Sequence, residues 1–294
     1  MKDTLIKRLK NEPMRNHTTF KTGGPAETVY LPSTAREILD TVHSAVESGI
    51  PWYVIGRGSN LLVSDRGYPG AVIKIAESFA EIRIQGNRVY ADAGALLRDI
   101  TAKCIGSGLS GLEFAGGIPG ALGGGISMNA GAYGGELKDF ITYVRVLTPE
   151  LEIKDIPAGD MRFGYRKSAV QDEGYIVLGA EFCLPKGDIE VSRKLLLSLN
   201  NKRKNSQPLN FPSAGSTFKR PPGHYAGTLI EQCGLKACKI GGAQVSEKHA
   251  GFIINTGEAT SEDIYKLICH VRSVVFQKAG VTLEPEVKMI GDFT

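Results

Sequence analysis

The chain has 294 residues, of which 42% are hydrophobic and 22% charged, and its formal net charge is +4. This composition is typical of a folded globular protein and excludes a disordered or fibrous one. The small positive excess favours an anionic ligand. It lacks the concentrated basic face of nucleic-acid binders, so no nucleic-acid partner is expected.

Membrane and metal signals are also weak. No apolar run reaches the roughly 18 residues of a membrane span, and the N-terminal segment MKDTLIKRLKNEPM is too polar for a signal peptide. We therefore expect a cytoplasmic protein with no membrane partner. The five cysteines form no CxxC pair and the five histidines no HExxH motif, which predicts reduced, buried thiols and no metal site.

Helix and strand patterns alternate in the first third of the chain. A capping-box pattern from Thr34 to Glu37 opens an amphipathic helix that ends at Gly49. Short strands are predicted at 52–55, 71–75, 81–84 and 88–91. A helix over 95–105 follows, with Gly106 as its C-cap.

The sequence after residue 105 predicts further helices and strands and one domain boundary. An exposed helix over 188–204 ends in the basic cluster NKRKN, and a proline-rich stretch follows, so we place the boundary within 186–208. The further predicted helices are 225–233 and 261–279, and the further predicted strands are 141–148, 175–183, 251–255 and 281–290. No internal repeat is present, which argues against an interaction scaffold.

The glycine-rich segment 111–135 contains ten of the 36 glycines of the chain. Glycine weakens helices and strands by roughly 0.5 to 1 kcal/mol per site, so such a run indicates positive φ angles or exposed amides. A second loop, GRGSNLL at 56–62, follows a strand and adds the side-chain donors Ser59 and Asn60. Two amide-rich loops in the amino-terminal lobe predict a long phosphate-bearing cofactor.

Two common nucleotide-binding motifs do not explain these loops. GSGLSG at 106–111 matches G-x-G-x-x-G, but it follows a predicted helix instead of joining a strand to a helix, which argues against a Rossmann site. The sequence also contains no GxxxxGK[ST] motif, which argues against a P-loop enzyme.

Five ordered motifs carry a family resemblance. They are GRGSNLLVSD, AGGIPGALGGGISMNAGAYGGE, FGYRKS, GSTFKRP and LEPEVKMIG, within residues 16–291. In this order they resemble the UDP-N-acetylenolpyruvoylglucosamine reductase family, flavoenzymes of peptidoglycan precursor synthesis. The short C-terminal part resembles the subgroup that lacks an extra substrate-covering loop.

The resemblance implies an α+β protein with the FAD-binding fold of the vanillyl-alcohol-oxidase-like (PCMH-type) class. Two α/β subdomains, 1–75 and 76–205, would hold FAD, and a smaller α/β domain, 206–294, would bind the substrate. By the same resemblance, the FAD diphosphate contacts are Arg57, Gly58, Ser59 and Asn60. The remaining flavin contacts are Ile118, Pro119, Gly123, Gly124, Ser127, Asn129 and Gly131.

The reaction implied by the family is a two-stage hydride transfer. NADPH reduces FAD and leaves, and the enolpyruvyl group of the UDP-sugar then takes the hydride, which gives UDP-N-acetylmuramate. Hydride addition to the vinyl carbon pushes negative charge into the carboxylate, so the site needs a cation and a proton donor. No obligate protein partner is inferred.

Three motif residues resemble the catalytic set of the family. Arg166 in FGYRKS is expected to hold the substrate carboxylate, because a guanidinium offers two parallel hydrogen bonds and stays charged. Ser216 in GSTFKRP is the expected proton donor, helped by Lys219 or Arg220. Glu286 in LEPEV is the third residue, chosen over the neighbouring Glu284 by its place in the motif.

The expected substrate contacts are Tyr165, Arg203, Gln207 and Arg220. Relatives commonly have a lysine where this chain has Ser206, so phosphate binding is expected to fall to Lys204 or Arg203. The alternative interpretation of NKRKN, less favoured here, is a solvated helix end.

Other interpretations stay open at this point. Taken without the family, Arg166 is typical of a surface ion pair and Ser216 of a turn serine beside Gly215. A related flavin oxidase of a small alcohol would share the cofactor lobe but not the pairing of Ser216 with Glu286. A non-catalytic nucleotide-binding module would give a colourless protein.

Overall fold

The computed structural model describes residues 6–293, which form two compact units. Unit 1 contains residues 6–9, Val29–Arg57 and Ala71–Arg203. Unit 2 contains Lys10–Thr28, Gly58–Gly70 and residues 204–293. Each unit is therefore assembled from segments that are far apart in the sequence.

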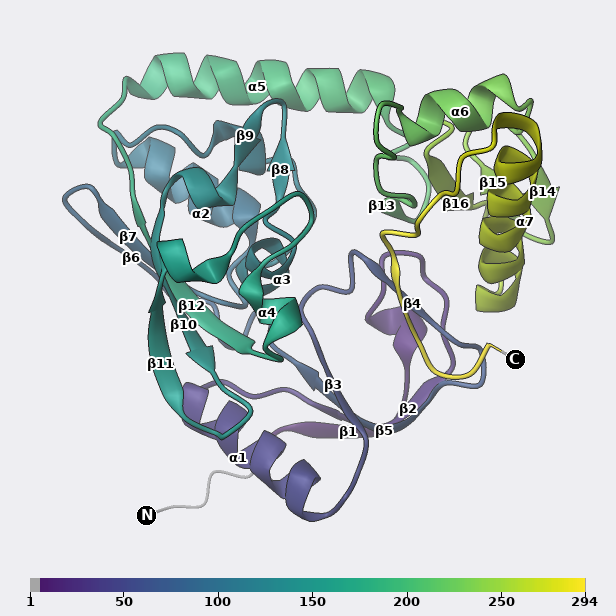
Figure 1. Ribbon diagram of the computed structural model, residues 1–294. Helices are drawn as coiled ribbons and strands as arrows, with labels where there is room; N and C mark the ends of the chain where they lie inside the picture. Colours follow the sequence, from purple (N-terminus) through teal and green to yellow (C-terminus); the bar gives the residue numbers. More distant parts are fainter. Residues whose placement is uncertain (1–5, 294) are drawn as a thin grey trace. The chain divides into compact units, whose positions relative to one another are not determined.

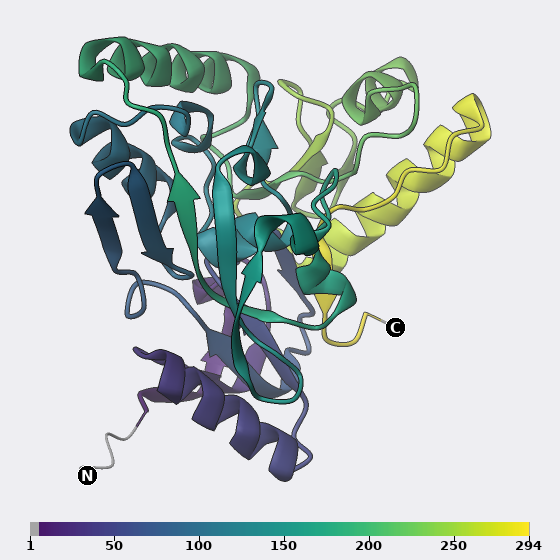
Figure 2. The ribbon, with the colours of Figure 1, turned by 60° about the vertical axis from the view of Figure 1, so that its left-hand side comes forward.

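Unit 1 is built around an antiparallel sheet of order β11-β10-β12-β7-β6, with β6 and β7 at one edge (Figure 2). Its strands are β6 (Ile82–Gln85), β7 (Arg88–Asp92), β10 (Ile141–Leu147), β11 (Ile153–Pro157) and β12 (Ile176–Cys183). Ala180 of β12 lies opposite Val144 on one side and Ala91 on the other, and all three are fully buried. The central strands thus form the core of the unit.

Helices complete unit 1. They are α1 (Ala35–Glu47), α2 (Leu97–Gly106), α3 (Leu122–Ser127), α4 (Ala169–Asp172) and most of α5 (Ile189–Ser206), the long helix of Figure 1. A second sheet, whose strands contain residues of both units, has the order β1-β2-β5-β3. Its strands are β1 (Arg8–Pro13), β2 (Pro25–Tyr30), β3 (Trp52–Ile55) and β5 (Tyr68–Lys74). In it β3 pairs parallel with β5, Trp52 opposite Ala71.

Unit 2 packs helices against a small antiparallel sheet of order β13-β16-β15-β14. Its strands are β13 (Ser213–Ser216), β14 (Lys239–Ile240), β15 (Ala243–Val245) and β16 (Phe252–Asn255), and its helices are α6 (Ala226–Gln232) and α7 (Ser261–Ala279). Figure 1 shows α7 lying against β14, β15 and β16. Phe20 and Leu62 are fully buried in the same core as Leu267 and Val271 of α7.

Two contacts anchor earlier chain segments in unit 2. Strand β4 (Leu61–Val63) pairs parallel with β17 (Lys288–Ile290). The Asp65 carboxylate accepts hydrogen bonds from the amides of Ser261 (2.9 Å) and Glu262 (2.8 Å) at the start of α7. A carboxylate at this end of a helix satisfies unpaired amides and complements the helix dipole.

The predicted helices are confirmed, with two corrections at their ends. In α1 the Thr34 hydroxyl accepts a hydrogen bond from the Glu37 amide (3.1 Å), but the Glu37 carboxylate accepts from the Ser33 amide (2.7 Å) and not from that of Thr34. At the end of α2, Gly106 is still helical and Ser107 is the cap. Gly108 takes the left-handed conformation, with φ +70°, so the predicted C-cap at Gly106 was wrong.

The predicted strands 52–55, 81–84, 88–91, 141–148, 175–183 and 251–255 are confirmed to within one residue at each end, and 71–75 lies within β5 apart from its last residue. The predicted strand 281–290 is mostly wrong. Of the predicted strand 281–290, the structure has Lys288–Ile290 as β17, while Pro285 forms an isolated bridge with Phe218. Proline has no amide to donate to a ladder, which limits pairing there. The glycine-rich segment, expected as a loop, contains α3 and the hairpin strands β8 (Gly131–Ala132) and β9 (Gly135–Glu136).

Candidate functional site

Arg166 lies in a tight turn of unit 1. The amide of Gly164 donates to the Lys167 carbonyl (2.9 Å), and the Lys167 amide donates back (3.3 Å). Arg166 has φ +57°, a left-handed conformation that costs a non-glycine residue roughly 1 to 2 kcal/mol. Its guanidinium lies 5.0 Å from the ring centre of Tyr165. The turn thus holds the predicted carboxylate-binding residue in a defined conformation.

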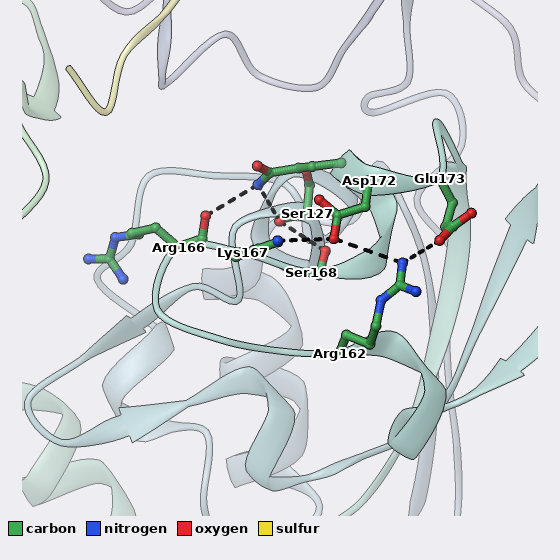
Figure 3. A network of polar contacts seen from close by, with 8 residues as sticks. Ser127, Arg162, Arg166, Lys167, Ser168, Asp172 and Glu173 are labelled. Atoms are coloured by element: carbon green, nitrogen blue, oxygen red, sulfur yellow. Dashed lines mark hydrogen bonds and ion pairs between the residues drawn. The ribbon is translucent and has the colours of Figure 1, made fainter. Parts of the chain in front are cut away.

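Hydrogen bonds fasten this turn to the glycine-rich segment. The Ser127 carbonyl accepts from the Ser168 hydroxyl (2.9 Å) and from the side-chain nitrogen of Gln171 (2.8 Å), which also donates to the Arg166 carbonyl (3.3 Å). Figure 3 shows the Arg166 guanidinium extending away from these partners. Ser168 lies within the FGYRKS motif, whereas no sequence signal indicated Gln171.

Asn129 also contributes to the hydrogen bonds that join the glycine-rich segment to the Arg166 turn. It is fully buried with φ +41°, and its amide group donates to Glu136 (2.9 Å) and to the Gly164 carbonyl (3.1 Å) and accepts from the Lys138 amide (3.2 Å). Hydrogen bonds from Lys138 and Asn129 lower the pKa of Glu136, with a smaller contribution from Arg166. The Asn129 side chain therefore supports the Arg166 turn.

The first predicted cofactor loop is shaped by Gly58. With φ +64°, a Cβ atom at this position would lie 1.9 Å from the His17 carbonyl oxygen, so only glycine fits. The Gly58 carbonyl accepts a hydrogen bond from the Thr19 amide (3.1 Å). Gly58, Ser59 and Asn60 belong to unit 2, while Arg57 belongs to unit 1 and contacts Glu77 at 3.2 Å. The loop was expected within one lobe, and the units divide it.

The glycines of 111–135 have different neighbours. Gly116 and Gly117 lie beneath α5, where a Cβ atom would approach Leu196 and Asn200 to 2.6 Å. Gly123 packs on Ala93. At Gly124, a Cβ atom would have no described atom within 4 Å. The segment thus combines close packing of helices with backbone that faces open space.

Ser216 stands at a β-bulge of unit 2. Ser213 lies opposite Ile254 and Ser216 opposite Phe252, so one extra residue is inserted in β13. Gly215 within the bulge has φ +76°, a conformation that glycine adopts without a steric penalty. Bulges redirect side chains, and here Ser216 is exposed while the neighbouring Thr217 is fully buried.

Glu286 lies next to the Ser216 strand. Its amide donates to the Thr217 carbonyl (2.8 Å), and its carbonyl accepts from the Asn60 side chain (3.0 Å). Glu286 is half-buried, whereas Glu284 is exposed and paired with the Lys219 ammonium. Unit 2 therefore brings together the segments of Ser216, Glu286 and Asn60, while Arg166 belongs to unit 1.

The predicted substrate residues have distinct settings. Burial lowers the pKa of Arg203, and its Nε atom has no hydrogen-bond partner among residues 6–293. The Arg220 guanidinium lies 4.5 Å from the ring centre of Tyr225. Gln207 lines a cavity of about 470 Å³ in unit 2, together with Lys204 and Lys248.

Comparison with known families defines the class of protein. Residues 26–156 match the family model described as FAD binding domain, and this range contains both predicted cofactor loops. Residues 207–290 match the model of the UDP-N-acetylenolpyruvoylglucosamine reductase C-terminal domain. The chain is thus an FAD-binding flavoprotein with a second, C-terminal module.

Similar proteins specify the family. The chain is 46% identical over 284 residues to the UDP-N-acetylenolpyruvoylglucosamine reductase of Alkaliphilus oremlandii, covering 97% of this chain and 93% of that protein. It is 48% identical over 282 residues to the enzyme of the same name from Caldanaerobacter subterraneus, with coverages of 96% and 93%. The crystal structure of UDP-N-acetylenolpyruvylglucosamine reductase from Thermus caldophilus matches with TM-score 0.83 and 33% identity, covering 97% and 99%.

The chain belongs to the UDP-N-acetylenolpyruvoylglucosamine reductase family. It is an FAD-dependent oxidoreductase, and the predicted α+β FAD-binding fold is confirmed. Among the helices of residues 6–293, none is long and apolar enough to cross a membrane.

The described residues fit FAD. The Ser59 hydroxyl and the Arg57 guanidinium are donors that suit a diphosphate, and Gly58 and Asn60 can add backbone amides. The open space at Gly124 lets a ligand approach the backbone. Gly131 is explained without a ligand, because a Cβ atom there would lie 2.7 Å from the Gly135 carbonyl oxygen.

Proposed function

We propose that Arg166, Ser216 and Glu286 carry out the family reaction in this chain: the NADPH-dependent reduction, through FAD, of the enolpyruvyl group of UDP-N-acetylglucosamine enolpyruvate to UDP-N-acetylmuramate. The observation that carries this proposal is the hydrogen bond of the Glu286 amide to the Thr217 carbonyl (2.8 Å), which holds Glu286 beside the residue that follows Ser216. The reaction needs two small-molecule substrates and no protein partner.

Arg166 binds the substrate carboxylate in this proposal. When bound, FAD would accept a hydride from NADPH and, once reduced, supply a hydride to the vinyl carbon. The carboxylate gains negative charge as the hydride arrives, and a fixed guanidinium stabilises that charge more than the charge of the ground state. The turn supports this role because its hydrogen bonds fix the backbone from which the guanidinium extends (Figure 3).

Ser216 delivers a proton to the carbon next to the carboxylate. A hydroxyl is a weak acid, so it needs a neighbour that accepts a hydrogen bond or returns a proton. Glu286 is half-buried and joined to the Ser216 strand through Thr217, which suits it for that role. Glu284 is less suited, because the Lys219 ammonium already neutralises it.

The 470 Å³ cavity is the proposed site of the nucleotide part of the substrate. Lys204, Gln207 and Lys248 line this cavity, and the Lys248 ammonium donates a hydrogen bond to the Lys204 backbone carbonyl (2.6 Å). Two cations suit a diphosphate. We propose that Lys204 and Lys248 supply the charge that relatives place at Ser206. Tyr165, Arg203 and Arg220 stay predicted substrate contacts.

The three-part division into 1–75, 76–205 and 206–294 also stays a proposal. The C-terminal family match from residue 207 supports a substrate domain that begins near 206. The cofactor contacts proposed above are those predicted from the sequence, with Asn60, Asn129 and Gly131 contributing backbone atoms.

Anaerobic kinetics test the catalytic assignment. Ser216→Ala should leave flavin reduction by NADPH unchanged and slow reoxidation by the enolpyruvyl sugar nucleotide by about 10²- to 10⁴-fold, the range of a lost acid–base group. Glu286→Gln should slow the same step. If Ser216→Ala impaired flavin reduction instead, Ser216 would not be the proton donor.

A further inference from the structure

Asn60 contacts the Glu286 segment twice. Its side-chain nitrogen donates to the Glu286 carbonyl (3.0 Å), and its own carbonyl accepts from the Lys288 amide (3.0 Å). The second bond lies where β4 begins to pair with β17, with Leu61 opposite Lys288. Asn60 therefore fixes both the position and the register of the chain that carries Glu286.

Glu286 is held from its other side by the Ser216 strand. Its amide donates to the Thr217 carbonyl, and two residues away the Lys219 amide donates to the Glu284 carbonyl (2.9 Å). Thr217 itself is anchored, because its hydroxyl accepts from the Ile253 amide (3.1 Å). The peptide groups flanking the Glu286 side chain are thus fixed by Thr217 at the N–H and by Asn60 at the C=O.

We propose that Asn60 is a positioning residue for Glu286 and acts on the second half of the reaction, although it lies in the GRGSN loop expected to bind the FAD diphosphate. One N–H of its amide is already used by the Glu286 carbonyl. A misplacement of about 1 Å can cost on the order of 100-fold in rate. The inference rests on the proposed catalytic role of Glu286.

Binding of FAD by the Asn60 side chain is the alternative role, and it leads to different expected results. If the Asn60 side chain served FAD, its loss would weaken flavin binding and leave the rates of the flavin-loaded enzyme unchanged. If it positions Glu286, its loss should slow the sugar step and loosen residues 284–290 while flavin affinity is kept. Flavin affinity and amide exchange are readouts that do not depend on turnover.

The experiment compares Asn60→Ala with the wild type. We expect an FAD dissociation constant within about threefold and unchanged flavin reduction by NADPH, but reoxidation by the enolpyruvyl sugar nucleotide slower by about 10- to 100-fold. The amide of Lys288 should exchange faster with solvent. Asn16→Ala is the matched control, because Asn16 is exposed and bonds the Glu12 side chain on the surface (3.1 Å).

A double mutant separates this inference from the proposal on which it rests. If Asn60 acts through Glu286, Asn60→Ala combined with Glu286→Gln should be no slower in the sugar step than Glu286→Gln alone. Additive losses would overturn the positioning role. A Glu286→Gln enzyme with normal reoxidation would overturn the catalytic role of Glu286 instead.

Asn60→Asp is a second variant that tests the inference even if the alanine variant fails to fold. It keeps the size of the side chain but places an acceptor against the Glu286 carbonyl, so it should show the same slow sugar step. Weakened FAD binding with normal reoxidation at saturating FAD, in either variant, would assign Asn60 to the cofactor and reject the inference.

Discussion

At the scale of single residues, the turn around Arg166 separates backbone roles from side-chain roles. Hydrogen bonds from Gln171 and between Gly164 and Lys167 fix the backbone, and the guanidinium extends away from them (Figure 3). The left-handed φ of Arg166 carries a steric cost that these contacts must offset. A charged residue held in this way suits a role in which orientation matters as much as charge.

Arg166→Lys tests that view. Lysine keeps the charge but offers no paired, planar hydrogen bonds to a carboxylate. We expect the sugar half-reaction to slow by about 10²- to 10³-fold, as for loss of a transition-state donor, with flavin reduction unchanged. Lys167→Met is the control, because Lys167 is exposed and pairs with Asp172 (3.1 Å). Equal loss of rate in both variants would contradict the assignment.

Buried thiols show how environment sets reactivity. Burial, together with the nearby Glu113, raises the pKa of Cys104 to about 12, and its side chain is 1% exposed. Cys183, in contrast, is exposed. At pH 8 the folded protein should react with a disulfide reagent such as Ellman's reagent at Cys183 and at Cys104 only after unfolding. Equal labelling rates, located by mass spectrometry of the peptides, would show that Cys104 is accessible.

At the scale of elements, local patterns predicted the long helices well. The apolar spacing of α7 and the capping pattern of α1 were sufficient, because those signals lie within the elements themselves. The two- to four-residue strands β13, β14 and β15 were missed. β13 pairs with the later strand β16, whereas β14 and β15 form a local hairpin with Ile240 opposite Ala243. Segments this short carry little strand preference of their own.

The site shows the same division between local and distant information. The motifs supplied the proposed catalytic residues Arg166, Ser216 and Glu286, and the structure adds the link from Asn60 to Glu286 across 226 positions. No local pattern reports a contact of that span. The helix α3, with sequence LGGGIS, also contradicts helix propensity, since its glycines admit Ala93 and Leu97 at close range.

The capping box of α7 predicts a pH dependence. Burial raises the pKa of Asp263, but hydrogen bonds from the amides of Thr260 and Gly242 outweigh it, and the pKa is lowered overall. A lowered pKa in the folded state stabilises the protein above the unfolded value of about 3.9, and this stabilisation is lost as the pH falls through the folded value.

Urea unfolding of wild type and Asp263→Asn should measure this effect. At pH 7 the wild type should have the larger free energy of unfolding, and the difference should shrink as the pH falls below about 4. Glu262→Gln is the control, because Glu262 is a half-buried neighbour whose carboxylate pairs with Lys266 (3.2 Å). A difference that is the same at pH 7 and pH 2.5 would exclude the charge of Asp263 as its cause.

At the scale of the whole molecule, unit 2 is not formed by one continuous segment. The family match begins at residue 207, but the unit also contains Lys10–Thr28 and Gly58–Gly70. These segments supply the buried Phe20 and Leu62, the strand partner of β17 and the Asp65 carboxylate at α7. In addition, the Asn255 side chain donates to the Phe20 carbonyl (2.9 Å).

The C-terminal fragment 204–294 should therefore fail to fold cooperatively by itself, although a family model covers most of it. It would expose the surface that Phe20 and Leu62 cover, and such aromatic or aliphatic losses cost about 2 to 5 kcal/mol each, comparable with the stability of a small domain. Circular dichroism during urea unfolding measures the transition.

In the full chain, Phe20→Ala should lower the free energy of unfolding by about 3 to 5 kcal/mol. Phe276→Ala is the control and should change it little, because Phe276 is 58% exposed on α7. A sharp unfolding transition of the fragment, with native-like amide dispersion by NMR, would show instead that residues 204–294 form an autonomous domain.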